Sequence, residues 1–170
     1  MYEIGEMIVY GNSGVCEVTG YDSPKLPGIN PEQKYYTLRP LYGNGTIYCP
    51  VDNPRVFMRP VLSREEAESL IDLIPEICAE PCHSTQVQEI TNHYRSAIDT
   101  HDCADLIELV MSIYCKKQAA EANGRKMSQL DGRYMKLAED LLYGEFAVAL
   151  SMPKDSVREY ISSRVGDAAE

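Results

Sequence analysis

Tryptophan is absent from the 170-residue chain and phenylalanine occurs only twice, so its aromatic side chains are almost all tyrosines, 12 in number. Any aromatic core or stacking surface must therefore use tyrosine. No apolar run approaches the roughly 18–20 residues that a membrane-spanning helix needs. The first residues carry acidic side chains where a secretory signal peptide would carry basic ones. These absences predict a cytoplasmic protein with no membrane partner.

Motifs of catalysis are also lacking. The sequence holds no G-x-S-x-G elbow, no phosphate-binding loop and no H-E-x-x-H pair. Its carboxylates are scattered over predicted helix surfaces rather than paired where a pocket would form. An enzyme is therefore the least favoured class, and we predict no catalytic residues.

Disulfide bonds are not expected, although the sequence has six cysteines. A chain without an export signal, and large enough to bury a core, should keep them as reduced and mostly buried thiols. They are Cys16, Cys49, Cys78, Cys82, Cys103 and Cys115. Cys78, Cys82 and His83 have a C-x3-C-H spacing, but no second pair is placed to complete a four-ligand zinc site. We predict no metal and no cofactor, and keep a Cys/His metalloprotein as the weakest hypothesis.

Positive charge is scarce. Lys and Arg number 16 against 26 Asp and Glu, which gives a formal net charge of −10. Residues 1–62 carry a net charge of −1 and residues 63–170 carry −9. Nucleic-acid-binding proteins usually show a basic footprint, and a field of this sign repels phosphate. The exception is residues 116–136, where six basic side chains stand against two acidic ones. This cluster is either a solvated face or a site of DNA contact.

Up to residue 62 the chain has the pattern of a small β domain. Short β-prone runs alternate with glycine and proline. Residues 42–45, Tyr-Gly-Asn-Gly, supply the positive φ angles of a tight hairpin turn. Five strands in so short a segment suit a small barrel, because closure removes exposed strand edges. The expected strands are residues 7–10, 14–21, 34–41, 46–51 and 55–61.

From Ser63 onward the apolar residues recur at helical spacing. Ser63 and Glu66 have the spacing of a capping box, and Ser128 is positioned to cap a later helix with Asp131 at the box position. The expected helices are residues 63–74, 85–99, 101–123, 128–150 and 154–164. The chain is thus predicted to be an α+β protein of two domains, a five-stranded barrel at residues 1–62 and an acidic helical domain at residues 63–170.

The opening segment resembles the CarD family. Residues 4–15, I-G-E-M-I-V-Y-G-N-S-G-V, are similar to the G-D-x-V-V-Y-P-x-x-G-V pattern with which its members begin. Residues 35–38 and 46–51 fall where that family has its third and fourth strands. Residues 106–110 and 127–150 resemble its helical domain, so that the likeness covers roughly residues 3–152.

The resemblance implies a Tudor-like barrel that binds the β subunit of bacterial RNA polymerase, as in the transcription-repair coupling factor. It also implies a helical domain that touches promoter DNA and helps to hold the open complex. The residues implied in polymerase docking, on strands two and four and in the loop after strand two, are Tyr21, Lys25, Ile47, Tyr48 and Cys49. Those implied in contact with the DNA backbone are Arg95, Arg125, Lys126 and Arg133.

Two departures from the family pattern bear on these implications. In the best-known members the DNA-contacting helix begins with a Trp wedge followed by Arg residues, whereas residues 86–90 here read Q-V-Q-E-I. Actinobacterial members place an Arg just before the Val-Pro of strand four, where this chain has Tyr48. The chain lacks the residues for a Trp wedge in the minor groove and for one ion pair with polymerase, although Tyr48 can pack at an interface.

Two principal hypotheses follow. A transcription regulator would dock on RNA polymerase through the barrel and change the lifetime of the promoter open complex. An adaptor that does not bind DNA would use the same barrel but present its acidic helical domain to another protein. In both cases we expect a non-enzymatic monomer.

Overall fold

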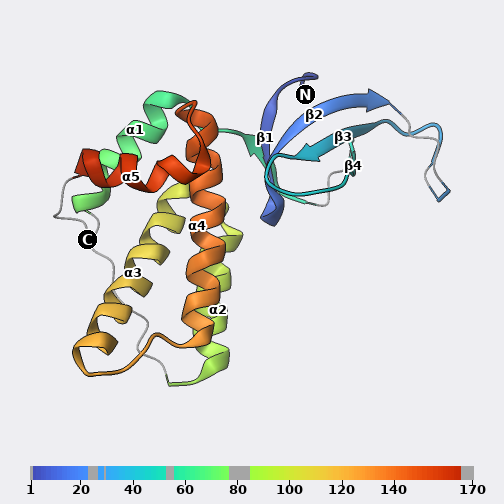
Figure 1. The fold of residues 1–170 in the computed structure, drawn as a ribbon. Coiled ribbons are helices and arrows are strands. Elements are labelled where there is room, and N and C mark those ends of the chain that lie inside the picture. Colours follow the sequence, from blue (N-terminus) through green and yellow to red (C-terminus); the bar gives the residue numbers. More distant parts are fainter. Residues whose placement is uncertain (1, 23–26, 29, 53–55, 77–84, 166–170) are drawn as a thin grey trace. The chain divides into compact units, whose positions relative to one another are not determined.

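The computed structural model of the chain describes residues 2–22, 27–28, 30–52, 56–76 and 85–165. Its internal contacts divide the chain into two compact units, Met1–Val61 and Leu62–Glu170. Strands make up the first unit and helices the second, each around its own hydrophobic core, so the chain is an α+β protein (Figure 1).

Five antiparallel strands form the sheet of the N-terminal unit, in the order β4-β3-β2-β1-β5. Each of β1 to β3 pairs with the strand that follows it in the chain, and β5 returns to pair with β1. The strands are β1 (Met7–Tyr10), β2 (Gly14–Asp22), β3 (Tyr35–Pro40), β4 (Ile47–Pro50) and β5 (Met58–Pro60). The predicted hairpin is therefore confirmed, since β3 and β4 flank residues 42–45 and pair directly.

The sheet is open. No backbone pairing joins β4 to β5 in the part of the N-terminal unit that the structure describes, so the predicted closed barrel is not confirmed. The two edge strands still meet through their side chains, because the Sγ atom of Cys49 lies 3.5 Å from the Sδ atom of Met58. Both edges are short, with four and three residues, which limits the hydrogen-bond ladder that they could form.

The inner face of this sheet follows from the two-residue period of a strand. Residues that oppose each other on neighbouring strands point to the same side, and one in two enters the core. The opposing pairs that pack in this core are Ile8–Cys16, Val18–Leu38 and Tyr36–Cys49. Val9 and Val15, which also oppose each other, are buried on the other face. Thiols thus pack as small apolar groups, as expected for reduced cysteines.

Gly11 begins the single-turn 3-10 helix Gly11–Ser13 that joins β1 to β2, and a side chain at this position should destabilise the N-terminal unit. Its φ is +47°, and an added Cβ would lie 2.5 Å from Cγ1 of Val56. We expect Gly11→Ala to lower the free energy of unfolding of the N-terminal unit by about 1–3 kcal/mol, measured by urea denaturation. Gly45→Ala is the control, because Gly45 also has a positive φ, +92°, but nothing lies within 4 Å of the added atom. Equal losses in the two variants would show that Val56 yields without cost.

The C-terminal unit contains five α-helices: α1 (Arg64–Leu73), α2 (Val87–Asp99), α3 (Cys103–Ala122), α4 (Gln129–Ala149) and α5 (Lys154–Val165). The 3-10 turn η2 (Ile74–Glu76) extends α1. Side chains at the helix starts satisfy free backbone N–H groups: Ser63 and Glu66 form the predicted capping box, and Asp102 and Ser128 cap α3 and α4.

The long helices α2, α3 and α4 run side by side, and α1 and α5 lie across one end of them (Figure 1). The core follows the helical spacing of the apolar residues; on α2, for example, Ile90, Tyr94 and Ile98 are buried four residues apart. Tyr94 and Phe146 are the largest side chains that are fully enclosed. Among the described residues no helix is both long and apolar enough to cross a membrane.

Candidate functional site

The outer face of the sheet presents polar and aromatic side chains on β2, β3 and β4. Arg39 forms an ion pair with Glu17, its opposing residue on β2. On the next strand Tyr48 opposes Thr37 and is 37% exposed. Because β4 is an edge strand, Tyr48 lies beside a backbone edge that could accept another strand.

The structure does not gather the residues implied in polymerase docking on one exposed surface. Ile47 and Cys49 flank Tyr48 on β4, so their side chains turn to the opposite face, where both pack with the core. Tyr21 also packs there, with its ring 5.6 Å from that of Tyr36. Lys25 lies outside the described residues. Tyr48 is therefore the one described member of the set whose side chain is turned outward.

Sequence reasoning missed other exposed apolar groups of the N-terminal unit. Tyr42, Val56 and Phe57 are between 37% and 47% exposed, in the β3–β4 turn and just before β5. The sequence placed residues 56 and 57 inside a strand, and only the later start of β5 at Met58 leaves them outside it. Exposed aromatic side chains of this kind are enriched at protein interfaces.

Arg125, Lys126 and Arg133 lie where α3 turns into α4, and Arg95 lies in the second half of α2. Arg95 and Arg133 meet at Tyr134: the Nε–H of Arg95 donates to the tyrosine hydroxyl at 3.3 Å, and the Arg133 guanidinium stands 5.5 Å from the ring centre. Arg125 and Lys126 are exposed in the α3–α4 connection. We call the set Arg95, Lys117, Arg125, Lys126, Arg133 and Lys136 the basic end.

Asp131 reduces the charge of this region from within. Its carboxylate is 3% exposed, accepts a 2.6 Å hydrogen bond from the hydroxyl of Tyr94, and lies 3.2 Å from Nζ of Lys116. The sequence had assigned Asp131 to the capping box of α4, but only half of that motif forms, with its backbone N–H donating to Ser128. Its side chain instead joins α2, α3 and α4, and it neutralises Lys116.

The remaining cations divide sharply by position. Outside the basic end and Lys116, every Lys or Arg of the helical unit forms an ion pair. Those residues are Arg64, Lys154, Arg158 and Arg164. No member of the basic end forms one with a described residue. The unit is acidic overall, yet its uncompensated positive charge is concentrated at one place.

The first turn of α2 borders the basic end. Val87 is 67% exposed at the first helical position, and Glu89 adds a negative charge in the same turn. A helix N-terminus carries a partial positive charge from its unpaired N–H groups, and both α2 and α4 begin at this end. The arrangement suits an anion that spans several donors, such as a phosphate backbone, but Glu89 opposes it.

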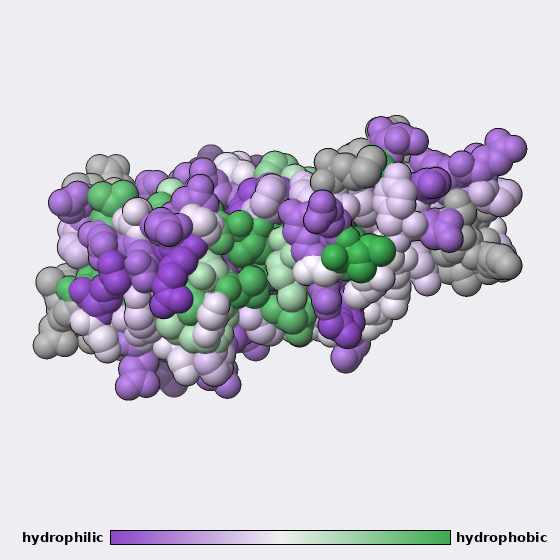
Figure 2. Space-filling model, turned by 90° about the horizontal axis from the view of Figure 1, so that it is seen from above, coloured by the Kyte–Doolittle hydropathy of each residue, from purple (hydrophilic) through white to green (hydrophobic). Residues whose placement is uncertain are grey.

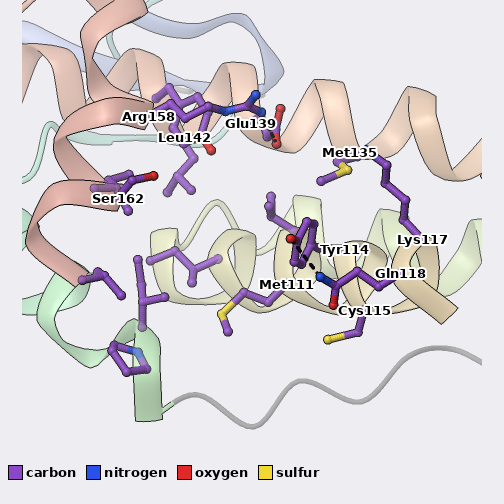
Figure 3. Close-up of a pocket in the computed structure, with 17 residues that line it drawn as sticks. Met111, Tyr114, Cys115, Lys117, Gln118, Met135, Glu139, Leu142, Arg158 and Ser162 are labelled. Atoms are coloured by element: carbon purple, nitrogen blue, oxygen red, sulfur yellow. Dashed lines mark hydrogen bonds and ion pairs between the residues drawn. The ribbon is translucent and has the colours of Figure 1, made fainter. Parts of the chain in front are cut away.

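A groove of about 550 Å³ lies between α3, α4, α5 and η2 (Figure 3). Its lining is mainly apolar, with Met111 from α3 and Met135 from α4 on facing walls. Arg158 and Glu139 line it and pair at 2.9 Å.

The described cysteines are free thiols: Cys16, Cys49 and Cys103 are buried and Cys115 is exposed. Burial raises the pKa of Cys16 to about 11 from its ordinary 9.0. The folded state therefore gains stability from this thiol below pH 9 and loses it as the pH rises toward 11. The predicted C-x3-C-H segment lies outside the described residues; within them, no three His, Cys, Asp or Glu side chains are grouped to hold a metal.

Thiol alkylation should separate these cysteines. We expect iodoacetamide at pH 8 to modify Cys115 at least about tenfold faster than Cys16 or Cys49, because a reagent needs access and a thiolate. Mass spectrometry of tryptic peptides would give the individual rates. Denatured protein serves as the control, in which the three rates should converge. Equal rates in the folded protein would contradict the burial of Cys16 and Cys49.

Comparison with known proteins bears on the N-terminal unit. Residues 2–62 match the family model described as the CarD-like/TRCF RID domain. This range coincides with the sheet unit and ends just before the capping box of α1. No curated protein matches the chain significantly.

Proposed function

Because residues 2–62 make this chain a member of the CarD-like family, whose RID domains interact with RNA polymerase, we propose that it is a non-enzymatic bacterial transcription regulator. Its sheet docks on the polymerase β subunit in the cytoplasm. Its helical unit then contacts the backbone of promoter DNA through the basic end, and the protein alters the lifetime of the open complex as a monomer.

The family match to the sheet unit is the observation that carries this proposal. The edge strand β4 adds a physical route to docking, since a partner strand could pair with its outer backbone edge. Tyr48 would then lie on the surface beside the added strand. Cys49 and Ile47 contribute backbone groups to such pairing but not side chains, because these are turned to the core.

A pull-down with the isolated polymerase β-subunit lobe tests the docking step. We expect the full-length chain to bind, and Tyr48→Ala to weaken binding about tenfold, as truncation of an interface aromatic commonly does. Leu41→Ala is the matched control, since Leu41 is also 37% exposed in the same unit; its affinity should change by less than about twofold. No binding by the unaltered chain would refute docking on the β subunit, whereas binding unaffected by Tyr48→Ala would refute only the role of β4.

The charge distribution supports contact with DNA by the basic end. Elsewhere in the unit, Lys and Arg side chains already form ion pairs with Asp or Glu. At the basic end they form none with a described residue, so a DNA phosphate could bind them there without breaking an ion pair. Contacts of this kind add affinity that falls with salt, and they carry no sequence information. The expected role is therefore to hold DNA that polymerase has already positioned.

An anisotropy titration with promoter DNA in the presence of polymerase tests this contact. Arg125→Gln with Arg133→Gln should lower the slope of log affinity against log salt concentration by about 2, one unit for each lost phosphate contact. Lys154→Gln with Arg158→Gln removes the same charge from paired positions and should leave the slope unchanged. If both double variants change it equally, net charge rather than the basic end determines DNA affinity.

The adaptor hypothesis remains the second candidate, because residues 63–170 carry a net charge of −9 and Glu89 stands in the first turn of α2. It predicts that the chain binds polymerase while the titration detects no salt-dependent contribution from Arg125 and Arg133. The two functions thus share the docking experiment and differ in the DNA experiment.

A further inference from the structure

The two helices at the end of the bundle opposite the basic end are shallowly packed. In α5, one of 12 residues is buried, Val157, and in α1 two of ten are, Ala67 and Ile71. By comparison α4 buries eight of its 21 residues and α3 six of 20. Segments with few buried apolar contacts open at lower free energy than the core, so α1 and α5 should separate from the bundle before it unfolds.

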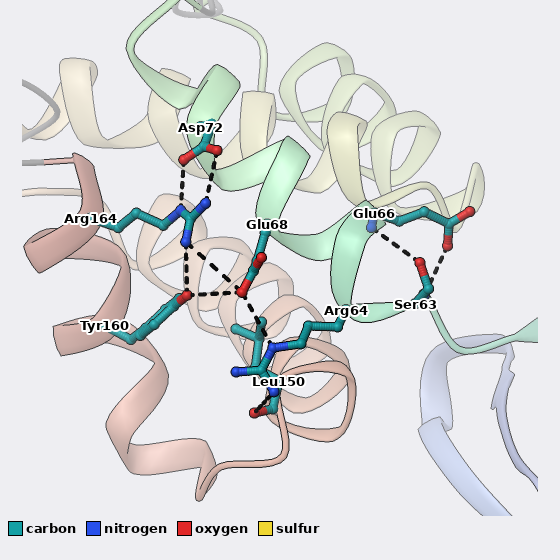
Figure 4. Close-up of polar contacts among 8 residues, drawn as sticks. All are labelled: Ser63, Arg64, Glu66, Glu68, Asp72, Leu150, Tyr160 and Arg164. Carbon is teal, nitrogen blue, oxygen red and sulfur yellow. Dashed lines mark hydrogen bonds and ion pairs between the residues drawn. The ribbon is translucent and has the colours of Figure 1, made fainter.

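Polar contacts compensate for this shallow packing between α5 and α1 (Figure 4). The guanidinium of Arg164 on α5 grips the carboxylate of Asp72 on α1 with two hydrogen bonds, Nε to Oδ1 at 2.6 Å and Nη2 to Oδ2 at 3.0 Å. This hydrogen bonding lowers the pKa of Asp72 and raises that of Arg164. Both side chains remain partly exposed, so the pair is accessible to water and to salt.

The same arginine extends the contact along α1. Its Nη1 group donates to the hydroxyl of Tyr160 at 3.1 Å, and that hydroxyl lies 3.4 Å from the carboxylate of Glu68. Glu68 also accepts from Arg64 at 3.3 Å, one turn earlier on α1. Arg64 in turn reaches the carbonyl of Leu150 at the end of α4, at 3.5 Å. Seen from above, the surface of the helical unit shows hydrophilic residues interspersed with hydrophobic ones (Figure 2). A bidentate pair within a network is the arrangement in which surface charges contribute measurably.

The opposite side of α5 is fastened to α4. Arg158 pairs with Glu139 at 2.9 Å and its guanidinium lies 5.9 Å from the ring centre of Tyr143. At the start of α5, Lys154 pairs with Asp140 at 3.4 Å. The helix α5 therefore lies between the deep core helix α4 and the shallow helix α1, with ion pairs on both sides.

We propose that α5 is a strap that secures α1 to the bundle through the Arg164 network, and that opening the strap releases α1 while α3 and α4 stay folded. The helix α1 begins directly after the junction between the two units, which lies at residues 61 and 62. Release would convert ten helical residues, about 15 Å long, into chain that can extend to about 33 Å. Once the bond from the Leu62 N–H to Glu145 of α4 also breaks, these residues lengthen the connection between the two units. This inference does not depend on the proposed function.

Hydrogen exchange of the full-length chain, followed by mass spectrometry of its peptides, tests the strap. We expect Arg164→Ala to speed exchange in peptides of residues 62–76 roughly three- to tenfold, with exchange in α3 and α4 unchanged. Raised ionic strength should have the same effect on the unaltered chain and a smaller one on the variant. Arg164→Lys, which keeps the charge but loses the two-pronged grip, should fall between them.

Lys154→Ala is the matched control, because it removes an α5 cation that contacts α4 and leaves the Arg164 network in place. Its exchange in residues 62–76 should stay within about twofold of the unaltered chain. The proposal is overturned if Arg164→Ala leaves that exchange unchanged, if Lys154→Ala speeds it as much, or if α3 and α4 speed up in parallel. The last result would mean that α1 opens only when the whole bundle unfolds.

Discussion

Replacing Asp131 with alanine is expected to lower the free energy of unfolding of the helical unit by about 3 kcal/mol, the cost of stranding one partner of a buried ion pair. The carboxylate is enclosed and joins three helices, so its removal leaves the hydroxyl of Tyr94 and the ammonium of Lys116 without their acceptor. Lys116 is 30% exposed and can partly turn to water, which keeps the expected loss at the lower end for such pairs. Urea denaturation followed by helical circular dichroism measures it.

A double-mutant cycle separates the buried charge from the packing. Asp131→Asn with Lys116→Met removes both charges and should recover part of the loss seen in Asp131→Asn alone, because no uncompensated ammonium remains. Tyr94→Phe should cost only about 1–2 kcal/mol, since Asp131 keeps its lysine. An Asp131→Ala variant as stable as the unaltered protein would show that this carboxylate is not enclosed as described.

Replacing Glu145 with alanine should destabilise the same unit by about 2–4 kcal/mol, because buried donors would lose their acceptor. Glu145 lies on α4 and is 2% exposed. One carboxylate oxygen accepts the backbone N–H of Leu62 at 3.0 Å, and the other accepts the thiol of Cys103 at 3.1 Å. Denaturation with a helical signal again provides the measurement.

Asp140 is the control for this substitution. It lies on the same helix, but its side chain is 52% exposed and forms a surface ion pair with Lys154. Asp140→Ala should therefore cost less than about 1 kcal/mol. Comparable losses in the two variants would mean that Glu145 contributes through helix charge rather than through the two buried donors.

Local signals in the sequence predicted local structure well. Ser63 and Glu66 form the capping box that their spacing indicated, and Ser128 caps α4 at the predicted position. Each of these depends on groups within one helical turn, so no tertiary information was needed. The outcome was different for groups that bind partners far along the chain.

Asp131 and Tyr48 show the two kinds of failure. Asp131 satisfied the spacing of a capping box, but Tyr94 lies 37 residues away and Lys116 lies 15 away, and only the folded bundle brings those partners to it. Tyr48 was grouped with Ile47 and Cys49 by resemblance, although the two-residue period of a strand already places the three on alternating faces. The alternation of side chains along the strand is thus enough to predict from the sequence that Tyr48 points outward.

The hydrogen bond from Leu62 to Glu145 has a mechanical consequence. If polymerase holds the sheet while DNA holds the basic end, tension reaches the helical unit at residue 62, before α1 begins. The first bond to bear load there is the one from Leu62 to Glu145, which lies on α4, the helix with the most buried residues. Tension would thus pass from the junction to the centre of the bundle and bypass α1 until that anchor breaks. A force applied between the two units should first meet a stiff response, followed by a sudden yield.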